Sequence, residues 1–155
     1  MKRIVQSALV ELVLPIACAW VRNEEDAILR TGAPLSEAQL ADARRIGIAQ
    51  PERVRVLAVE TIPPRLHPVL RFLAQKFGLA FSGTIGMALG HGLFLCLEHR
   101  EDRSLLLHEL AHVAQYERLG FRRFLRQYLR ECLSLGYPLG ALEAEARDVT
   151  EMLSA

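Results

Sequence analysis

RSLLLHELAHVAQYERLG, residues 103–120, contains two histidines four positions apart, with a glutamate directly after the first. On a helix, residues i and i+4 lie on one face, so His108 and His112 can bind the same metal ion. The flanking residues are almost all apolar, and burying two imidazoles and a carboxylate among them is costly unless a partner satisfies them. A metal ion does so directly, and the alternative is a pair of hydrogen-bonded core histidines. The pattern therefore predicts a zinc site with one Zn²⁺ per chain.

The glutamate of this motif has the position of a general base. Glu109 lies about 100° around the helix from His108, which places its carboxylate beside the metal and not on it. Zinc lowers the pKa of a bound water toward about 7, and a neighbouring carboxylate can accept the proton. Gln115 and Arg118 occupy the glycine and last histidine positions of the longer motif HExxHxxGxxH. The third ligand is therefore expected from another part of the chain.

The final predicted helix offers two candidates for that ligand within LEAEARD, residues 142–148. Glu143 and Glu145 flank the predicted apolar stripe on opposite sides, so only one of them is expected to reach the metal. His67, His91 and His99 are weaker candidates, and an ordinary surface or core histidine is the favoured interpretation of each. The stripe itself consists of Leu139, Leu142, Ala146, Val149 and Leu153.

HELAHVAQ, followed some thirty residues later by E-x-E-A on a helix, resembles the gluzincin metallopeptidases. It is similar in particular to small bacterial zincin-like proteins with the pattern HELxHVxQY, and the resemblance covers residues 84–150. It implies a minimal zincin-like domain that cleaves peptide bonds with zinc. In gluzincins the ligand glutamate stands in E-x-x-A-[D/N], which Glu143 matches through Ala146, so the resemblance implies Glu143 as the preferred third ligand. Arg147 departs from that pattern, and the use of Asp148 instead would favour Glu145 as the ligand.

The same resemblance implies how a substrate is held. An extended peptide would pair with an exposed edge strand, supplied either by GLFLCLE, residues 92–98, or by TIGMALG, residues 84–90. The alternative is that both are simply core strands. An oxyanion stabiliser is also expected, for which Tyr128, Tyr137 and His91 are the candidates.

The rest of the chain predicts a single α+β domain over residues 1–155, with a small three-stranded sheet and packed helices. Residues 1–80 form a helical part with one strand, and residues 84–155 form a hairpin plus the metal-binding helices. Helices are predicted at residues 3–30, 36–46, 67–78, 103–118, 121–135 and 139–153. Ser36 and Asp102 are the expected N-caps of the second and fourth helices. A bend is expected near Pro15, and Pro138 is expected in the first turn of the last helix. Strands are predicted at 53–60, 84–89 and 93–98.

Composition supports an ordinary globular protein, with 51% hydrophobic and 24% charged residues and a net charge of +1. The basic segment FRRFLRQYLR, residues 121–130, has the pattern of an amphipathic surface helix, and no nucleic-acid partner is expected. Cys18, Cys96 and Cys132 are an odd number of widely spaced cysteines, which favours buried free thiols in a reducing compartment, the cytoplasm.

The N-terminal segment MKRIVQSALVELVLPIACAW superficially resembles a secretory signal. Gln6, Ser7 and Glu11 interrupt its apolar run, so no stretch long enough to span a bilayer is expected. One face of a helix would carry the apolar residues Val5, Leu9, Leu12 and Ile16. The segment is therefore predicted to be a structural helix packed on the core, without stable membrane insertion.

Two functions remain open at this stage. The first is a zinc-dependent metallopeptidase of the cytoplasm, in which Glu109 activates water and a peptide or protein is the substrate. The second is a non-catalytic, zinc-stabilised regulatory or partner-binding domain, because 155 residues leave little chain for a second lobe walling a cleft. Glu109 favours the enzyme, since a structural metal site has no need of it. The sequence leaves the oligomeric state open.

Overall fold

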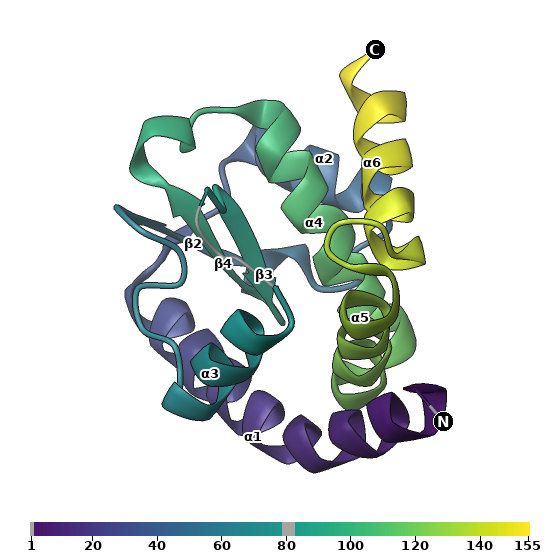
Figure 1. Cartoon of the computed structure of the whole chain (residues 1–155). Helices are drawn as coiled ribbons and strands as arrows, with labels where there is room; N and C mark the ends of the chain where they lie inside the picture. The colour runs from purple at the N-terminus through teal and green to yellow at the C-terminus, as the bar shows by residue number, and fades with distance from the viewer. Residues whose placement is uncertain (1, 79–82) are drawn as a thin grey trace.

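The computed structural model describes residues 2–78 and 83–155. A small mixed sheet lies between helices, and α4, α5 and α6 stand together on one side of the molecule (Figure 1). This is the α+β class that the sequence predicts. The described helices are α1 (Lys2–Thr31), α2 (Glu37–Ile46), α3 (Pro68–Lys76), α4 (Arg103–Leu119), α5 (Phe121–Leu135) and α6 (Ala141–Ser154), and the strands are β1 (Ala33–Pro34), β2 (Arg55–Val59), β3 (Gly86–Leu89) and β4 (Gly92–Cys96).

The sheet has four strands in the order β1-β2-β4-β3, where three were predicted. β2 and β4 are parallel, whereas β1 and β3 pair antiparallel at the two edges. The additional strand β1 forms where a simple break was expected, because Gly32 allows a close approach to β2: a Cβ there would lie 3.0 Å from that of Arg55. Pro34 is tolerated because β1 is an edge strand. The N-terminal part therefore contributes two strands, not one.

Successive side chains of β4 point to opposite faces of the sheet, and each face packs in its own hydrophobic cluster. Leu93 and Leu95 pack with α2 and α4, whereas Phe94 packs on the opposite face with α1. β4 is thus internal and fully covered. Of the two segments proposed as an exposed edge, TIGMALG contains the edge strand β3, and GLFLCLE is a core strand.

Local sequence signals account for most helix boundaries. Ser36 and Gln39 form a complete capping box at the start of α2, and the Asp102 side chain accepts from the N–H groups of Ser104 and Leu105 at the start of α4. Gly120 ends α4, and Gly136 ends α5, as predicted. The predicted strands 53–60 and 93–98 are shorter than expected, because Pro51–Arg53 and Leu97–His99 form 3₁₀ turns.

The start of α6 differs from the prediction. Pro138 and Leu139 lie before the helix, and the Leu139 side chain is 69% exposed instead of belonging to the apolar stripe. The reason is a tertiary cap: the Glu131 carboxylate of α5 accepts a 3.0 Å hydrogen bond from the Leu142 N–H. This satisfies one of the free N–H groups at the helix N-terminus, so α6 begins at Ala141.

α1 is a continuous helix through Pro15, but its buried face is not the predicted one. Val5 and Leu12 are 62% and 73% exposed. The helix packs against α5 as well as against the sheet, and both contacts determine which positions are covered. The buried apolar positions are Val10, Val13, Leu14, Ala17, Val21 and Ile28.

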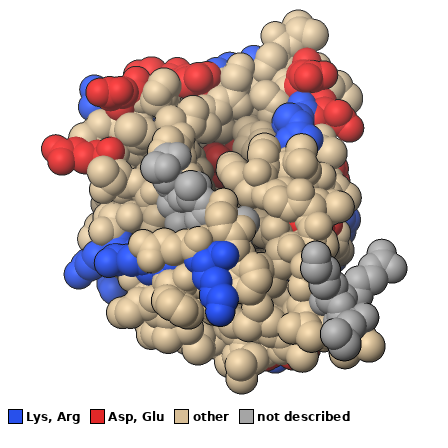
Figure 2. Space-filling view, in the orientation of Figure 1, with Lys and Arg blue, Asp and Glu red and all other residues tan. Residues whose placement is uncertain are grey.

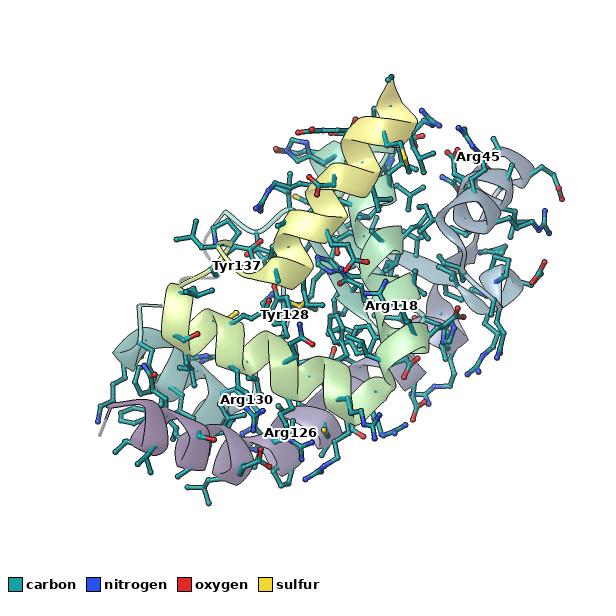
Figure 3. All side chains as sticks on the ribbon, turned by 90° about the vertical axis from the view of Figure 1, so that its right-hand side faces the viewer. Arg45, Arg118, Arg126, Tyr128, Arg130 and Tyr137 are labelled. Carbon is teal, nitrogen blue, oxygen red and sulfur yellow. The ribbon has the colours of Figure 1, made fainter. Side chains whose placement is uncertain are left out.

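By length and composition alone, the segment Ile4–Thr31 of α1 is capable of crossing a membrane. This corrects the expectation that polar interruptions leave no segment of sufficient length. Ion pairs also fix α1 to α5, because Arg126 and Arg130 contact the Glu11 carboxylate at 2.8 and 3.0 Å (Figure 3). Two arginines of the basic segment thus have a structural role. The three cysteines are free, as predicted, but they are half-buried where buried thiols were expected.

The hairpin turn is held by a partly buried charge cluster. The His91 ring lies 2.9 Å from Glu117 of α4 through Nε2 and 3.7 Å from Glu25 of α1 through Nδ1. The His91 backbone N–H also donates to Glu25 at 2.8 Å. Glu117 further accepts from the backbone N–H groups of Ala49 and Gln50 at 2.6 and 3.1 Å. We call Glu25, His91 and Glu117 the hairpin clamp, because it joins β3–β4 to both long helices.

The hairpin clamp predicts a pH-dependent stability. Hydrogen bonding to Glu25 raises the pKa of His91, which burial and the charge of Arg53 oppose. Burial raises the pKa values of Glu25 and Glu117, but hydrogen bonds from His91 outweigh it, so both pKa values are lowered. Protonated His91 therefore contributes its full share to the free energy of unfolding below its ordinary pKa near 6.5. This stabilisation is lost as pH rises through the raised pKa. The two carboxylates stabilise the fold above about pH 4.5, their ordinary pKa. This stabilisation is lost as pH falls through their lowered pKa values.

We expect His91→Gln to lower the free energy of unfolding by about 2 kcal/mol at pH 6, where all three clamp groups are charged. The difference from the unsubstituted protein should shrink as pH rises toward 9. Urea unfolding at pH 6, 7.5 and 9 measures it, and His99→Gln, outside the clamp, is the control. A difference that stays constant across this range would contradict the assignment.

Candidate metal centre

Three side chains from α4 and α6 converge where those helices pack together. His108 Nε2 lies 3.0 Å from Glu143 Oε2, and His112 Nε2 lies 3.4 Å from Glu143 Oε1. All the potential ligand atoms lie within 4.8 Å of one another. A tetrahedral Zn²⁺ with ligands at about 2.0–2.1 Å would hold neighbouring ligand atoms about 3.4 Å apart. The cluster could therefore hold a metal ion with little rearrangement.

Both α4 and α6 position the side chains that converge here. His108 and His112 are one turn apart on α4, with ring centroids separated by 4.9 Å and ring planes at 83°. Glu143 is in the first turn of α6, where a negative charge is favoured by the helix dipole. The Glu131 cap sets where that first turn begins. The position of Glu143 thus depends on α5 as well as on α6.

Glu145 lies outside the cluster. Its carboxylate forms two hydrogen bonds with the Arg118 guanidinium, at 2.7 and 2.9 Å, on the outer side of α4 and α6. Figure 3 shows Arg118 at that position. Arg147, which departs from the gluzincin pattern, donates to the Pro138 carbonyl and is exposed. Of the two glutamate candidates, only Glu143 lies with the histidines.

Gln115 is a site residue that the sequence reasoning did not identify. It is 1% exposed, and its Oε1 lies 2.8 Å from His112 Nδ1. Its Nε2 donates to the Leu142 carbonyl at 2.9 Å, which fixes the amide orientation. His112 Nδ1 therefore donates its proton to Gln115, and Nε2 is free to bind a metal ion. A polar residue three positions after a metal-binding histidine, in an otherwise apolar helix, was the available signal.

Glu109 is buried beside the cluster, with 5% of its surface exposed. Burial raises the pKa of this carboxyl group, while His112, His108 and hydrogen bonding from the Ala88 backbone oppose that rise. It lies directly against β3: a Cβ at position 86 would be only 2.5 Å from Glu109 Oε1. Gly86 is therefore the residue that leaves room for this carboxylate.

Two tyrosines lie between α5 and α6 on the cavity side (Figure 3). The Tyr128 hydroxyl donates to Glu143 Oε1 at 2.7 Å. Burial raises the pKa of Tyr128 well above its usual value and that of Tyr137 to about 12, so both hydroxyls stay protonated near neutral pH and can donate hydrogen bonds. The third candidate oxyanion stabiliser, His91, belongs to the hairpin clamp. His67 caps α3 by accepting from the Val69 N–H, and His99 ends a 3₁₀ turn.

The cluster opens into a cavity of about 200 Å³ between α1, α3, β3, α4 and α5. His108, Glu109, His112 and Glu143 all line it, together with Tyr128 and Tyr137. On the face drawn in Figure 2, the surface is hollowed near its centre and acidic side-chain atoms are visible in the recess. The candidate metal ligands, a carboxylate and two hydroxyl donors therefore share one accessible space.

Comparison of the chain with models of known protein families, with curated proteins and with solved structures gives no match. The residues and geometry of the metal centre are therefore the basis for inferring its function.

Proposed function

We propose that this protein is a zinc-dependent hydrolase with a minimal zincin-like domain, which cleaves amide bonds of peptide substrates in the cytoplasm. The observation that carries the proposal is the convergence of His108, His112 and Glu143 in one cavity with Glu109. Within the described residues this cluster offers three potential protein ligands. Catalytic zinc sites use three protein ligands and leave a position for water or substrate, whereas structural sites are closed by four.

Each residue then has a separate role in hydrolysis. A zinc ion bound by the three ligands would lower the pKa of water and polarise the substrate carbonyl. Glu109 accepts the proton of the attacking water and returns it to the leaving amine, as the C–O bond forms and the C–N bond breaks. Tyr137 can donate a hydrogen bond to the carbonyl oxygen as its negative charge develops, whereas the Tyr128 hydroxyl is already donated to Glu143. Gln115 keeps His112 in the orientation that binds metal.

The edge strand β3 supports an extended substrate at the cavity mouth. Ile85 O accepts from Cys96 N of β4, so by antiparallel alternation the polar groups of Thr84 and Gly86 point away from β4. A substrate backbone can pair with these groups. In that arrangement a carbonyl group of the substrate would lie close to Glu109, which lies against Gly86.

The direct test is the metal content of the purified protein by elemental mass spectrometry. We expect about one zinc per chain, and removal of zinc by a chelator should abolish peptide hydrolysis until zinc is restored. His112→Ala is the metal-free comparison, and His99→Ala controls for loss of a histidine elsewhere. Protein that carries no metal even after incubation with zinc would overturn the proposal.

A further inference from the structure

Polar groups of the cavity are concentrated at the metal-centre end. Away from the cluster and the two tyrosines, the walls are aliphatic or aromatic, supplied chiefly by α1, α3 and α5. Representative residues are Leu9, Val13, Leu70, Leu73, Leu129 and Leu133. A site of this kind favours a ligand with one polar reacting end and a long apolar remainder.

The cavity volume exceeds what one side chain requires. At about 200 Å³ it is more than ten times the space needed for a single water molecule. It extends from Glu143 of α6 to the first half of α1. An occupant that fills it must therefore reach from the metal-centre end to α1 and be largely apolar.

A polypeptide backbone is poorly suited to this interior. Each buried peptide group needs hydrogen-bond partners, and the helical walls have already paired theirs. On β3, Ala88 also points its polar groups outward, but its N–H interacts with Glu109 and its carbonyl lies 3.5 Å from the Tyr116 hydroxyl. Free partners for a backbone thus remain near Thr84 and Gly86, at the mouth. An alkyl chain needs no hydrogen-bond partners.

We propose that the cavity binds a long alkyl chain, and that the preferred substrates are amides whose acyl part is a long-chain fatty acid. This rests on the proposed hydrolase activity of the same metal centre. The acyl chain occupies the apolar walls, and the scissile carbonyl lies at the metal centre. The amine part leaves along Thr84 and Gly86. Hydrolysis consumes one water and yields a fatty acid and a free amine, so no further reactant is needed.

A series of N-acyl-glycinamides, from butanoyl to hexadecanoyl, tests the proposal on the unsubstituted zinc-loaded protein. We expect kcat/KM to rise about fourfold per added methylene until the cavity is filled, and then to level off. Affinity measured by calorimetry with the Glu109→Gln protein should rise in parallel without turnover. A flat dependence on chain length in both measurements would overturn the proposal.

Filling the cavity supplies a second test with a matched control. Ala74 of α3 is buried and lines the cavity, whereas its neighbour Gln75 is exposed. We expect Ala74→Trp to abolish the advantage of chains longer than octanoyl and to leave zinc content unchanged, whereas Gln75→Trp should change neither. If Ala74→Trp fails to fold, Ala17→Phe narrows the same cavity from α1.

The outcomes separate this inference from the proposed function. Hydrolysis of unacylated peptides with apolar side chains, and no chain-length dependence, would leave the hydrolase standing and reject the alkyl-chain site. Chain-length-dependent binding without hydrolysis of any amide would support the cavity assignment and reject the hydrolase.

Discussion

Replacing Glu109 with glutamine is expected to lower kcat for amide hydrolysis by about 10²–10⁴-fold, the usual contribution of a general base. Glutamine has nearly the same shape, so the contact with Gly86 and the packing against β3 should persist. The substitution removes the group that accepts a proton from water and leaves His108, His112 and Glu143 in place. Zinc content should therefore stay near one per chain. Single-turnover kinetics on zinc-loaded protein, with metal measured in the same sample, check both statements.

This experiment also separates the two functions that the sequence leaves open. If the cellular effect of the protein survives Glu109→Gln but is lost with His112→Ala, the metal has a structural role and the domain is a regulatory or partner-binding module. Glu145→Gln is the matched control, because it makes the same chemical change on the outer side of α6, in the ion pair with Arg118. A Glu109→Gln protein with full hydrolytic activity would rule out the proposed base.

Replacing Glu143 with glutamine is expected to weaken zinc binding by more than about a hundredfold, the upper range for losing a residue that only orients a ligand. The amide still accepts a hydrogen bond from Tyr128, but it carries no charge to balance a cation. Glu145→Gln should change zinc affinity by less than about twofold, because an exposed ion pair contributes little to its surroundings. Competition with a chromophoric chelator measures both affinities. The reverse ranking of the two variants would mean that Glu145, and not Glu143, binds the metal.

Features encoded within one turn of helix were predictable from the sequence. The caps Ser36 and Asp102 and the helix stops Gly120 and Gly136 each act within a few residues, and all were placed correctly. The facing of His108 and His112 likewise follows from helical spacing alone.

Features that depend on tertiary partners were not predictable in this way. The gluzincin pattern favours Glu143 through Ala146, but the pairing of Glu145 with Arg118 on the outer side has no signal in the sequence. The start of α6 is set by Glu131 on the preceding helix. The exposed side of α1 follows from its two packing partners, and β1 exists because β2 is available to pair with it.

The tertiary cap on α6 has a consequence for how this protein could change over evolutionary time. Because Glu131 fixes the first turn of α6, the position of Glu143 does not depend on the identity of Leu139, an exposed residue in the connection 136–140 between the helices. Gly140 is constrained, because a Cβ there would lie 2.7 Å from that of Glu131. Position 139 is therefore free to drift in sequence, or to be varied in a laboratory selection, without displacing the carboxylate. The same connection contains Tyr137, which lines the cavity and is a proposed donor to the oxyanion. Substitutions at position 137 would therefore change selectivity and chemistry together.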